Sequence, residues 1–117
     1  MIYTSYFSSR KYKLEDGISI ARYCGFWKGL VYDKLVPPEY LIRWWKGLSP
    51  EEQQSLDNIE QYKIAYITRV LAQLNVHDVA KELDNKVLLC YEKSADFCHR
   101  HIVAQWLQNN GYGCEEL

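Results

Sequence analysis

Apolar residues recur along this chain at every second position in some stretches and at every third or fourth position in others. Three stretches of strand length are rich in aromatic, β-branched and aliphatic residues: 1–7, 18–23 and 87–90. The last stretch is apolar throughout, which is typical of a strand buried on both faces of a sheet. The pattern therefore predicts three strands, with 87–90 in the interior of the sheet beside the first strand.

The long stretch between the second and third strands has helical periodicity. Residues 39–46 are expected to form a short helix that ends before Gly47. The segment 49–52 has the form of a capping box with proline at the first helical position, and its helix is expected to run to about Leu74. The apolar stripe of this helix comprises Ile59, Tyr62, Tyr66, Val70 and Leu74, widened by Leu56, Ile67 and Leu71.

Two further helices are expected in the second half of the chain. Asn75 is expected to cap a short helix, and Asp96 to cap a last helix that runs from about Phe97 to Asn109. Gly111 follows as a stop signal, and the tail beyond it is expected to add a weak edge strand.

Strands separated by helical segments predict a small three-layer α/β domain with a mainly parallel sheet flanked by helices. The length of 117 residues fits a single domain, 1–117. Because the carboxyl ends of parallel strands share one edge of a sheet, we expect the residues that follow the three strands to meet in one crevice.

Composition excludes some classes of partner. Charged residues make up 25% of the chain and the net charge is −1, so no overall attraction to nucleic acid or to an anionic membrane is expected. No apolar run reaches the length of a membrane span and no secretory signal follows Met1, so we expect a cytoplasmic location. The cysteines at positions 24, 90, 98 and 114 are then expected to be free thiols. The oligomeric state stays open.

The main candidates for chemistry follow the third strand. Cys98, His99 and Arg100 are expected in the first turn of the last helix, where the helix dipole and both basic side chains favour a thiolate. Cys98 is thus a candidate nucleophile, and the alternative is a buried packing residue. His99 is expected to serve the site rather than His101, because residues two apart point to different sides of a helix.

Acidic and basic side chains at the strand ends complete this candidate site. Glu92 is suited to proton exchange or to nucleophilic attack, and the alternative is an ion pair with an arginine. Arg22 and Arg100 are expected to bind a phosphate or carboxylate, because a guanidinium offers two parallel donors. Ser8, after the first strand, is expected to reach the same crevice.

A zinc site is an alternative use of the same sheet edge, with Cys24, Cys90, Cys98 and His99 as ligands. Their spacing matches no compact zinc motif, so we predict no metal ligand and no cofactor. Cys90 is expected to be a core residue. Trp44 and Trp45 are of a type that stacks on nucleic-acid bases, but without a basic run nearby we expect them in the core or as a lid over the crevice.

Several segments resemble a bacterial, archaeal and phage family known as domain of unknown function 488. They are residues 2–7, 18–23, 87–93 and 97–101, with the signature Cys-Tyr-Glu-Lys followed by Cys-His-Arg, and the resemblance extends over nearly the whole chain. It implies an α/β domain but no activity. The resemblance places the distinctive residues at Ser5, Arg22, Cys90, Glu92, Cys98, His99 and Arg100. Close relatives carry two prolines where this chain has Cys24-Gly25, so its loop after the second strand is expected to be more flexible.

Together these features predict a protein that binds or acts on a small phosphate-bearing, nucleotide-like ligand at the carboxyl edge of the sheet. The expected catalytic residues are Cys98, Glu92 and His99, and the expected ligand-binding residues are Arg22, Arg100, Ser5 and Ser8. Two alternatives are a non-catalytic nucleotide sensor or sequestering protein, and a redox or metal-linked regulatory thiol protein. No phosphate loop, acyl-transfer triad or kinase motif decides among them, so whether the protein is an enzyme stays open.

Overall fold

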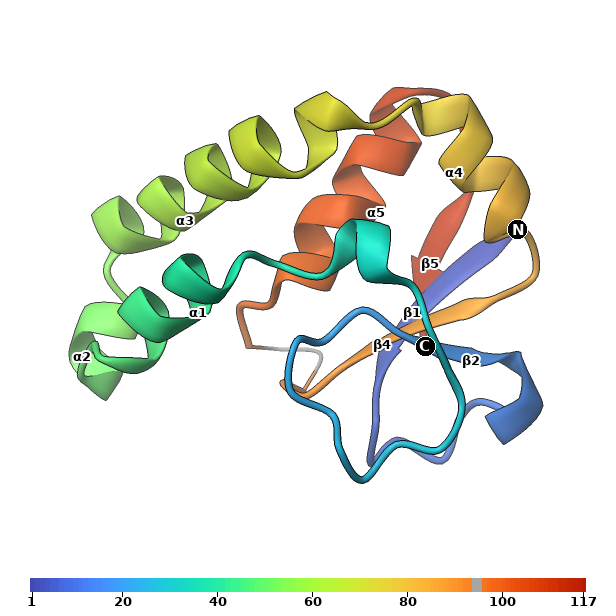
Figure 1. Ribbon diagram of the computed structural model, residues 1–117, viewed down its shortest axis with the longest axis horizontal. Coiled ribbons are helices and arrows are strands. Elements are labelled where there is room, and N and C mark those ends of the chain that lie inside the picture. Colours follow the sequence, from blue (N-terminus) through green and yellow to red (C-terminus); the bar gives the residue numbers. More distant parts are fainter. Residues whose placement is uncertain (94–95) are drawn as a thin grey trace.

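A computed structural model describes residues 1–93 and 96–117. In this part of the chain, five parallel strands form one sheet in the order β3–β2–β4–β1–β5 (Figure 1). The prediction of a small α/β domain with a parallel sheet flanked by helices is confirmed. The strands are β1 (Ile2–Tyr6), β2 (Gly17–Ser19), β3 (Leu30–Val31), β4 (Val87–Cys90) and β5 (Cys114–Glu116).

The uniformly apolar strand β4 lies at the centre of the sheet, as predicted. It pairs with β1, where Tyr3 lies opposite Val87, and with β2, where Ile18 lies opposite Leu88. All four residues of β4 are buried, because both faces of the sheet are covered. The predicted edge strand in the tail is confirmed as β5, which pairs with β1.

The α-helices lie above the strands in the view of Figure 1. The segments that connect β1 with β2 and β2 with β3 run below the helices. Buried apolar side chains of the helices form the main core with one face of the sheet, and Tyr66, Leu83 and Val103 are completely buried there. The helices are α1 (Glu39–Lys46), α2 (Pro50–Gln53), α3 (Leu56–Arg69), α4 (Val76–Glu82) and α5 (His99–Asn109), with short 3-10 helices at Leu14–Asp16, Asp33–Leu35 and Leu71–Gln73.

The connection between β2 and β3 covers the other face of the sheet at Gly17. A Cβ atom at this glycine would lie 2.8 Å from Leu89 Cδ1 and 2.9 Å from the indole of Trp27. Glycine is therefore required for the indole to lie this close to the backbone of the sheet. The second predicted strand, 18–23, is shorter than expected, because β2 ends at Ser19.

The helix predicted from residue 49 to Leu74 is interrupted. The capping box is present, since Ser49 Oγ accepts from the N–H of Glu52 at 3.1 Å and the Glu52 carboxylate accepts from the N–H of Ser49 at 2.8 Å. α2 nevertheless ends at Gln53, because Ser55 starts a second helix as its N-cap and accepts from the N–H of Asn58. The longest helix is therefore α3.

Two residues assigned to the apolar stripe of this helix, Leu56 and Ile67, are exposed. The remaining stripe is at least partly buried, and Tyr62 and Tyr66 form its centre. The predicted cap at Asn75 is confirmed, because its side chain accepts from two backbone N–H groups of α4.

The last helix begins two residues later than predicted. Its N-cap residue is Cys98, in an extended backbone conformation, and the Cys98 side chain makes no capping hydrogen bond. The predicted N-cap role of Asp96 is therefore wrong; its N–H donates to the carbonyl of Lys93. This shift places Cys98 directly before the helix, with His99 and Arg100 as its first two residues.

Candidate functional site

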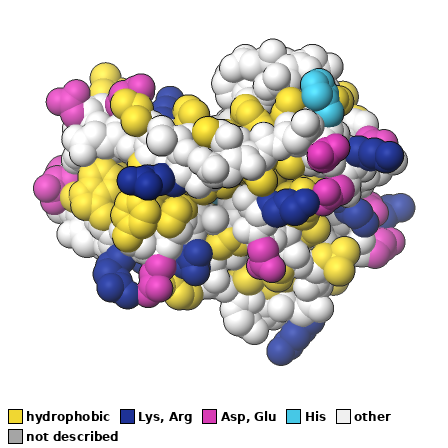
Figure 2. Space-filling model, turned by 45° about the horizontal axis from the view of Figure 1, so that its top comes forward, with side chains coloured by type: hydrophobic (Ala, Val, Ile, Leu, Met, Phe, Trp, Pro, Cys, Tyr) yellow, Lys and Arg dark blue, Asp and Glu magenta, His cyan; other side chains and the backbone are white. Residues whose placement is uncertain are grey.

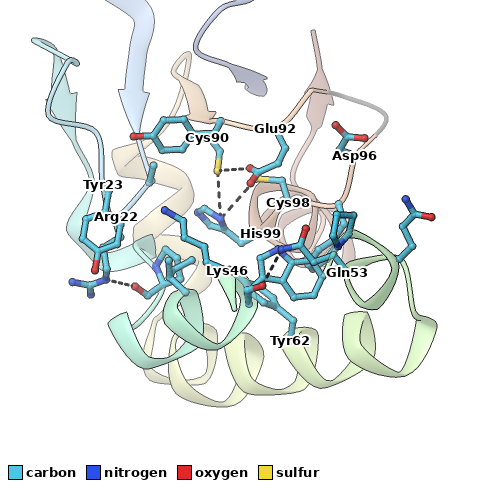
Figure 3. Close-up of a pocket in the computed structure, with 18 residues that line it drawn as sticks. Arg22, Tyr23, Lys46, Gln53, Tyr62, Cys90, Glu92, Asp96, Cys98 and His99 are labelled. Atoms are coloured by element: carbon cyan, nitrogen blue, oxygen red, sulfur yellow. Dashed lines mark hydrogen bonds between the residues drawn. The ribbon is translucent and has the colours of Figure 1, made fainter. Parts of the chain in front are cut away.

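A cavity of about 370 Å³ opens beyond the carboxyl ends of β2 and β4 (Figure 3). Its walls come from the segments that follow these two strands, from α1 and α2, from α3 and from the start of α5. The residues that follow β2 and β4 thus meet in one crevice, whereas the segment 7–10 after β1 does not line it. Among the residues that line it are Arg22, Lys46, Tyr62, Glu92, Cys98 and His99.

Cys90, Cys98 and His99 form a buried cluster in the wall of this cavity. Their sulfur and ring nitrogen atoms all lie within 4.8 Å of one another. His99 Nδ1 lies 3.6 Å from Cys90 Sγ and 3.8 Å from Cys98 Sγ (Figure 3). The end of β4 and the start of α5 therefore bring together residues from both halves of the sequence signature. Cys90, expected in the core, is indeed buried, but it also lines the cavity.

A hydrogen bond on the other side of the His99 ring determines which nitrogen carries the proton. His99 Nε2 lies 2.8 Å from the carbonyl oxygen of Ile20. A carbonyl oxygen can only accept, so Nε2 carries a hydrogen. In the neutral ring, Nδ1 is then free to accept a proton from a thiol. This is the arrangement of a Cys–His pair, in which the imidazole activates the sulfur.

The two thiols of the cluster have opposite pKa shifts. Burial alone would raise the pKa of Cys98, but the hydrogen bond from Cys90 and the positive charge of His99 lower this pKa well below that of an ordinary thiol. The hydrogen bond with Cys98 and burial raise the pKa of Cys90. Burial works against the charged form of His99, yet the neighbouring Cys98 thiolate raises its pKa. These opposite shifts favour the thiolate form at Cys98 and the thiol form at Cys90.

Glu92 extends the cluster toward the open part of the cavity. Its Oε2 accepts from the thiol of Cys90, with a sulfur–oxygen distance of 3.4 Å. Burial and the negative charge of Cys98 raise the pKa of Glu92. A carboxyl group whose pKa is raised in this way is suited to general acid and base chemistry.

Two cationic side chains, Arg22 and Lys46, line the cavity. Arg22 Nε donates to the carbonyl of Pro37 at 2.7 Å, which orients the guanidinium. Lys46 Nζ lies 5.0 Å from the ring centre of Tyr23 (Figure 3). In the described part of the chain Arg22 forms no ion pair with Glu92, so the pairing proposed from the sequence is not found.

Arg100 does not face the cavity, and the prediction that it does is wrong. Its side chain is completely buried and pairs with Glu116 of β5: Nε lies 3.1 Å from Oε1 and Nη2 lies 2.8 Å from Oε2. Successive residues of a helix are rotated by roughly 100°, and His99 occupies the cavity side. Two more predicted ligand-binding residues lie outside the lining: Ser5 is buried within β1 and Ser8 is exposed beyond it.

Sequence reasoning missed the contribution of α1 and α3 to the cavity. Trp45 lines it and lies against Phe97 and Tyr62, with ring centres 5.2 and 5.4 Å apart. Gln53 lines it as well and donates to the carbonyl of Trp45 at 2.9 Å. The sequence did suggest Trp45 as a lid over the crevice, which is close to its observed place in the cavity wall. No local sequence pattern identifies Lys46 or Gln53 as lining residues.

The exposed surface has a mixed charge. On the face shown in Figure 2, acidic and basic side chains alternate with hydrophobic ones. Among the residues that the structure describes, no helix is long and apolar enough to cross a membrane.

The parallel sheet, with a buried Cys–His pair at its carboxyl edge, defines an α/β domain with a thiol-centred candidate site. Residues 2–111 match the model of the DUF488-N3a family, described as the active DUF488-N3 subclade, and the chain belongs to this family. The family resemblance noted in the sequence is thereby confirmed. No curated protein and no solved structure matches the chain.

Proposed function

We propose that this protein binds a small phosphate-bearing, nucleotide-like ligand in the cavity and acts on it through Cys98. The observation that carries the proposal is the composition of one cavity of about 370 Å³, which combines two cations, flat aromatic side chains and a Cys–His pair. Small-molecule sites have this character, with mostly apolar walls and a few polar groups that orient the ligand.

The binding half of the proposal concerns Arg22 and Lys46. The guanidinium of Arg22 is held by the carbonyl of Pro37 through Nε alone. The described residues offer no further partner to its terminal nitrogens, which leaves two parallel donors for a phosphate. Tyr23, which is exposed, and Trp45, which is partly buried, supply aromatic surface in the same cavity, and such rings stack favourably on a nucleobase.

The chemical half concerns Cys98 and Glu92. His99 Nδ1 takes the thiol proton, and Cys98 Sγ forms a bond to an electrophilic carbon of the ligand as the bond to the leaving group breaks. Glu92 lies beside the sulfur atoms, where it gives the leaving group a proton and later takes one from water. The intermediate is a covalent thioether or thioester on Cys98.

Calorimetry with a panel of nucleoside mono-, di- and triphosphates tests the binding half. Replacing Arg22 or Lys46 by Ala is expected to weaken binding about tenfold or more, because each removes a charge-assisted hydrogen bond. Arg69→Ala is the matched control, since Arg69 is exposed on α3 and outside the cavity. Arg22→Lys is expected to restore binding only in part. Absence of binding to the wild type, or equal binding to all variants, would overturn the proposal.

Mass spectrometry of the intact protein, incubated with each binding ligand, tests the chemical half. The wild type and the control Cys114→Ser are expected to gain a ligand-derived mass, and Cys98→Ser is not. If the wild type binds a nucleotide but gives neither an adduct nor a product, the non-catalytic alternative, a nucleotide sensor or sequestering protein, replaces the enzymatic one.

A further inference from the structure

We propose that Cys90, Cys98 and His99 bind one Zn²⁺ ion, with the fourth coordination position open to the cavity. This inference does not rest on the identity of the ligand proposed above. It rests on the positions of three donor atoms in the described part of the chain.

The first support is the spacing of the donors. Zinc binds thiolate sulfur at about 2.3 Å and imidazole nitrogen at about 2.0–2.1 Å, so in a tetrahedral site these donors lie roughly 3.5 Å apart. The distances from His99 Nδ1 to the sulfur atoms of Cys90 and Cys98 are 3.6 and 3.8 Å. All three donors lie within 4.8 Å of one another. A single ion therefore reaches all three with little movement of the side chains.

The second support is the orientation of His99. A histidine that binds a metal usually donates its other ring N–H to a carbonyl or carboxylate, which fixes the ring and the tautomer. His99 Nε2 donates in this way to the carbonyl of Ile20 at 2.8 Å, and Nδ1 faces the two sulfur atoms. The ring is thus already held in a metal-binding orientation.

The third support is the combination of donor type and burial. Two thiolates and an imidazole suit zinc among the common divalent ions. Two thiolates also balance the charge of the ion, so that the buried cluster as a whole is neutral. Three protein donors with one open position is the pattern of catalytic rather than structural zinc sites. Glu92 lies next to this position, with its Oε2 3.4 Å from Cys90 Sγ.

The arrangement explains why motif spacing did not reveal the site. Two of the donors, Cys98 and His99, are adjacent in the sequence, and the third comes from the end of β4. Cys24 was the fourth ligand of the zinc alternative, but it is not part of the cluster; its sulfur lies 3.3 Å from Ser19 Oγ. Coordination to zinc engages a lone pair of the Cys98 thiolate and lowers its nucleophilicity. The metal-free form is therefore the more thiol-reactive one.

Titration of the chelator-treated full chain with Co²⁺, followed by Zn²⁺, tests the site directly. The wild type is expected to bind one Co²⁺ with a thiolate-to-cobalt charge-transfer band and the strong visible bands of a tetrahedral ion, and Zn²⁺ is expected to remove these bands. Cys98→Ser and Cys90→Ser are expected to weaken binding at least about tenfold. The matched controls Cys24→Ser and Cys114→Ser retain it.

A second measurement on the wild type keeps the test independent of variant folding. Zinc is expected to protect Cys90 and Cys98 from alkylation but to leave Cys24 unprotected, as read by peptide mapping. The inference is overturned if the wild type shows no thiolate–cobalt bands, or if Cys98→Ser and Cys114→Ser show equal bands. Neither measurement uses a nucleotide. Zinc binding can therefore be confirmed or refuted even if the protein binds no nucleotide.

Discussion

His99 and Arg100 are buried neighbours at the start of α5, yet they belong to two polar clusters with opposite properties. The cluster around Arg100 is closed: Glu116 accepts from its guanidinium with both carboxylate oxygens and from the hydroxyl of Thr4 at 2.6 Å. The cluster around His99 opens on the cavity and contains two thiols of unequal pKa. Within one contiguous sequence motif, Arg100 therefore contributes to stability and His99 belongs to the candidate reactive site.

Removal of Arg100 should give the largest effect on stability. Arg100→Ala is expected to lower the free energy of unfolding by about 2–3 kcal/mol, because it removes a completely buried guanidinium that donates two charge-assisted hydrogen bonds to the partly exposed Glu116. Urea denaturation measures this loss. The exposed Arg69→Ala on α3 is the control, and should change stability by no more than about 0.5 kcal/mol. Equal stability of both variants would show that the closed cluster is not a stabilising one.

Changes in the cluster around His99, which opens on the cavity, should affect the reactivity of its thiols more than the stability of the protein. In metal-free protein Cys98 is expected to react with iodoacetamide at least about tenfold faster than Cys114 at neutral pH, because the thiolate is the nucleophile. Burial, with the nearby Glu116 and Glu115, raises the pKa of Cys114 to about 11. The depressed pKa of Cys98 keeps it ionised as the pH falls, whereas the rate at Cys114 should fall about tenfold per pH unit below its pKa.

Peptide mapping across a pH series distinguishes the two thiols. A Cys98 rate that falls in parallel with the Cys114 rate would mean that the Cys–His pair does not ionise the sulfur. His99→Gln should produce this parallel behaviour, provided that its circular dichroism matches the wild type.

The smallest effect is expected at Ser5, which was proposed from the sequence as a ligand-binding residue. Its hydroxyl is completely buried and has no hydrogen-bond partner among the described residues. Ser5→Ala should therefore leave stability unchanged or raise it by up to about 1 kcal/mol, with ligand binding unaffected. The adjacent Thr4→Val, which breaks the bond to Glu116, should lower stability by about 1 kcal/mol. A greater loss in Ser5→Ala than in Thr4→Val would contradict this assignment.

The features that the sequence predicts correctly depend on local signals. The uniformly apolar run 87–90 identifies the central strand. A strand with apolar side chains on both faces must be covered on both faces of the sheet. The cap at Asn75 and the capping box at Ser49 are also local, because a side chain bonds to backbone groups two or three residues away.

The features that it misses depend on competition or on distant contacts. Ser55 interrupts the long helix because a second cap competes with continued helix, and sequence periodicity does not measure that balance. Arg100 turns away from the cavity because β5 brings Glu116 to the opposite side of α5, and the pairing of β5 with β1 is not readable from either segment. Lys46 reaches the cavity only because α1 packs where it does.

The position of β1 in the sheet has a consequence for how the protein is made. Both of its neighbours, β4 and β5, come from the last third of the chain. A ribosome therefore releases the first strand long before either partner exists, and the loop that must close between β1 and its partners is long. Until then this strand has no edge to join, and exposed strands of this kind aggregate readily. The sheet around β1 is thus completed only after β4 and β5 have been made, and the nascent chain is expected to depend on chaperones that shield the first strand.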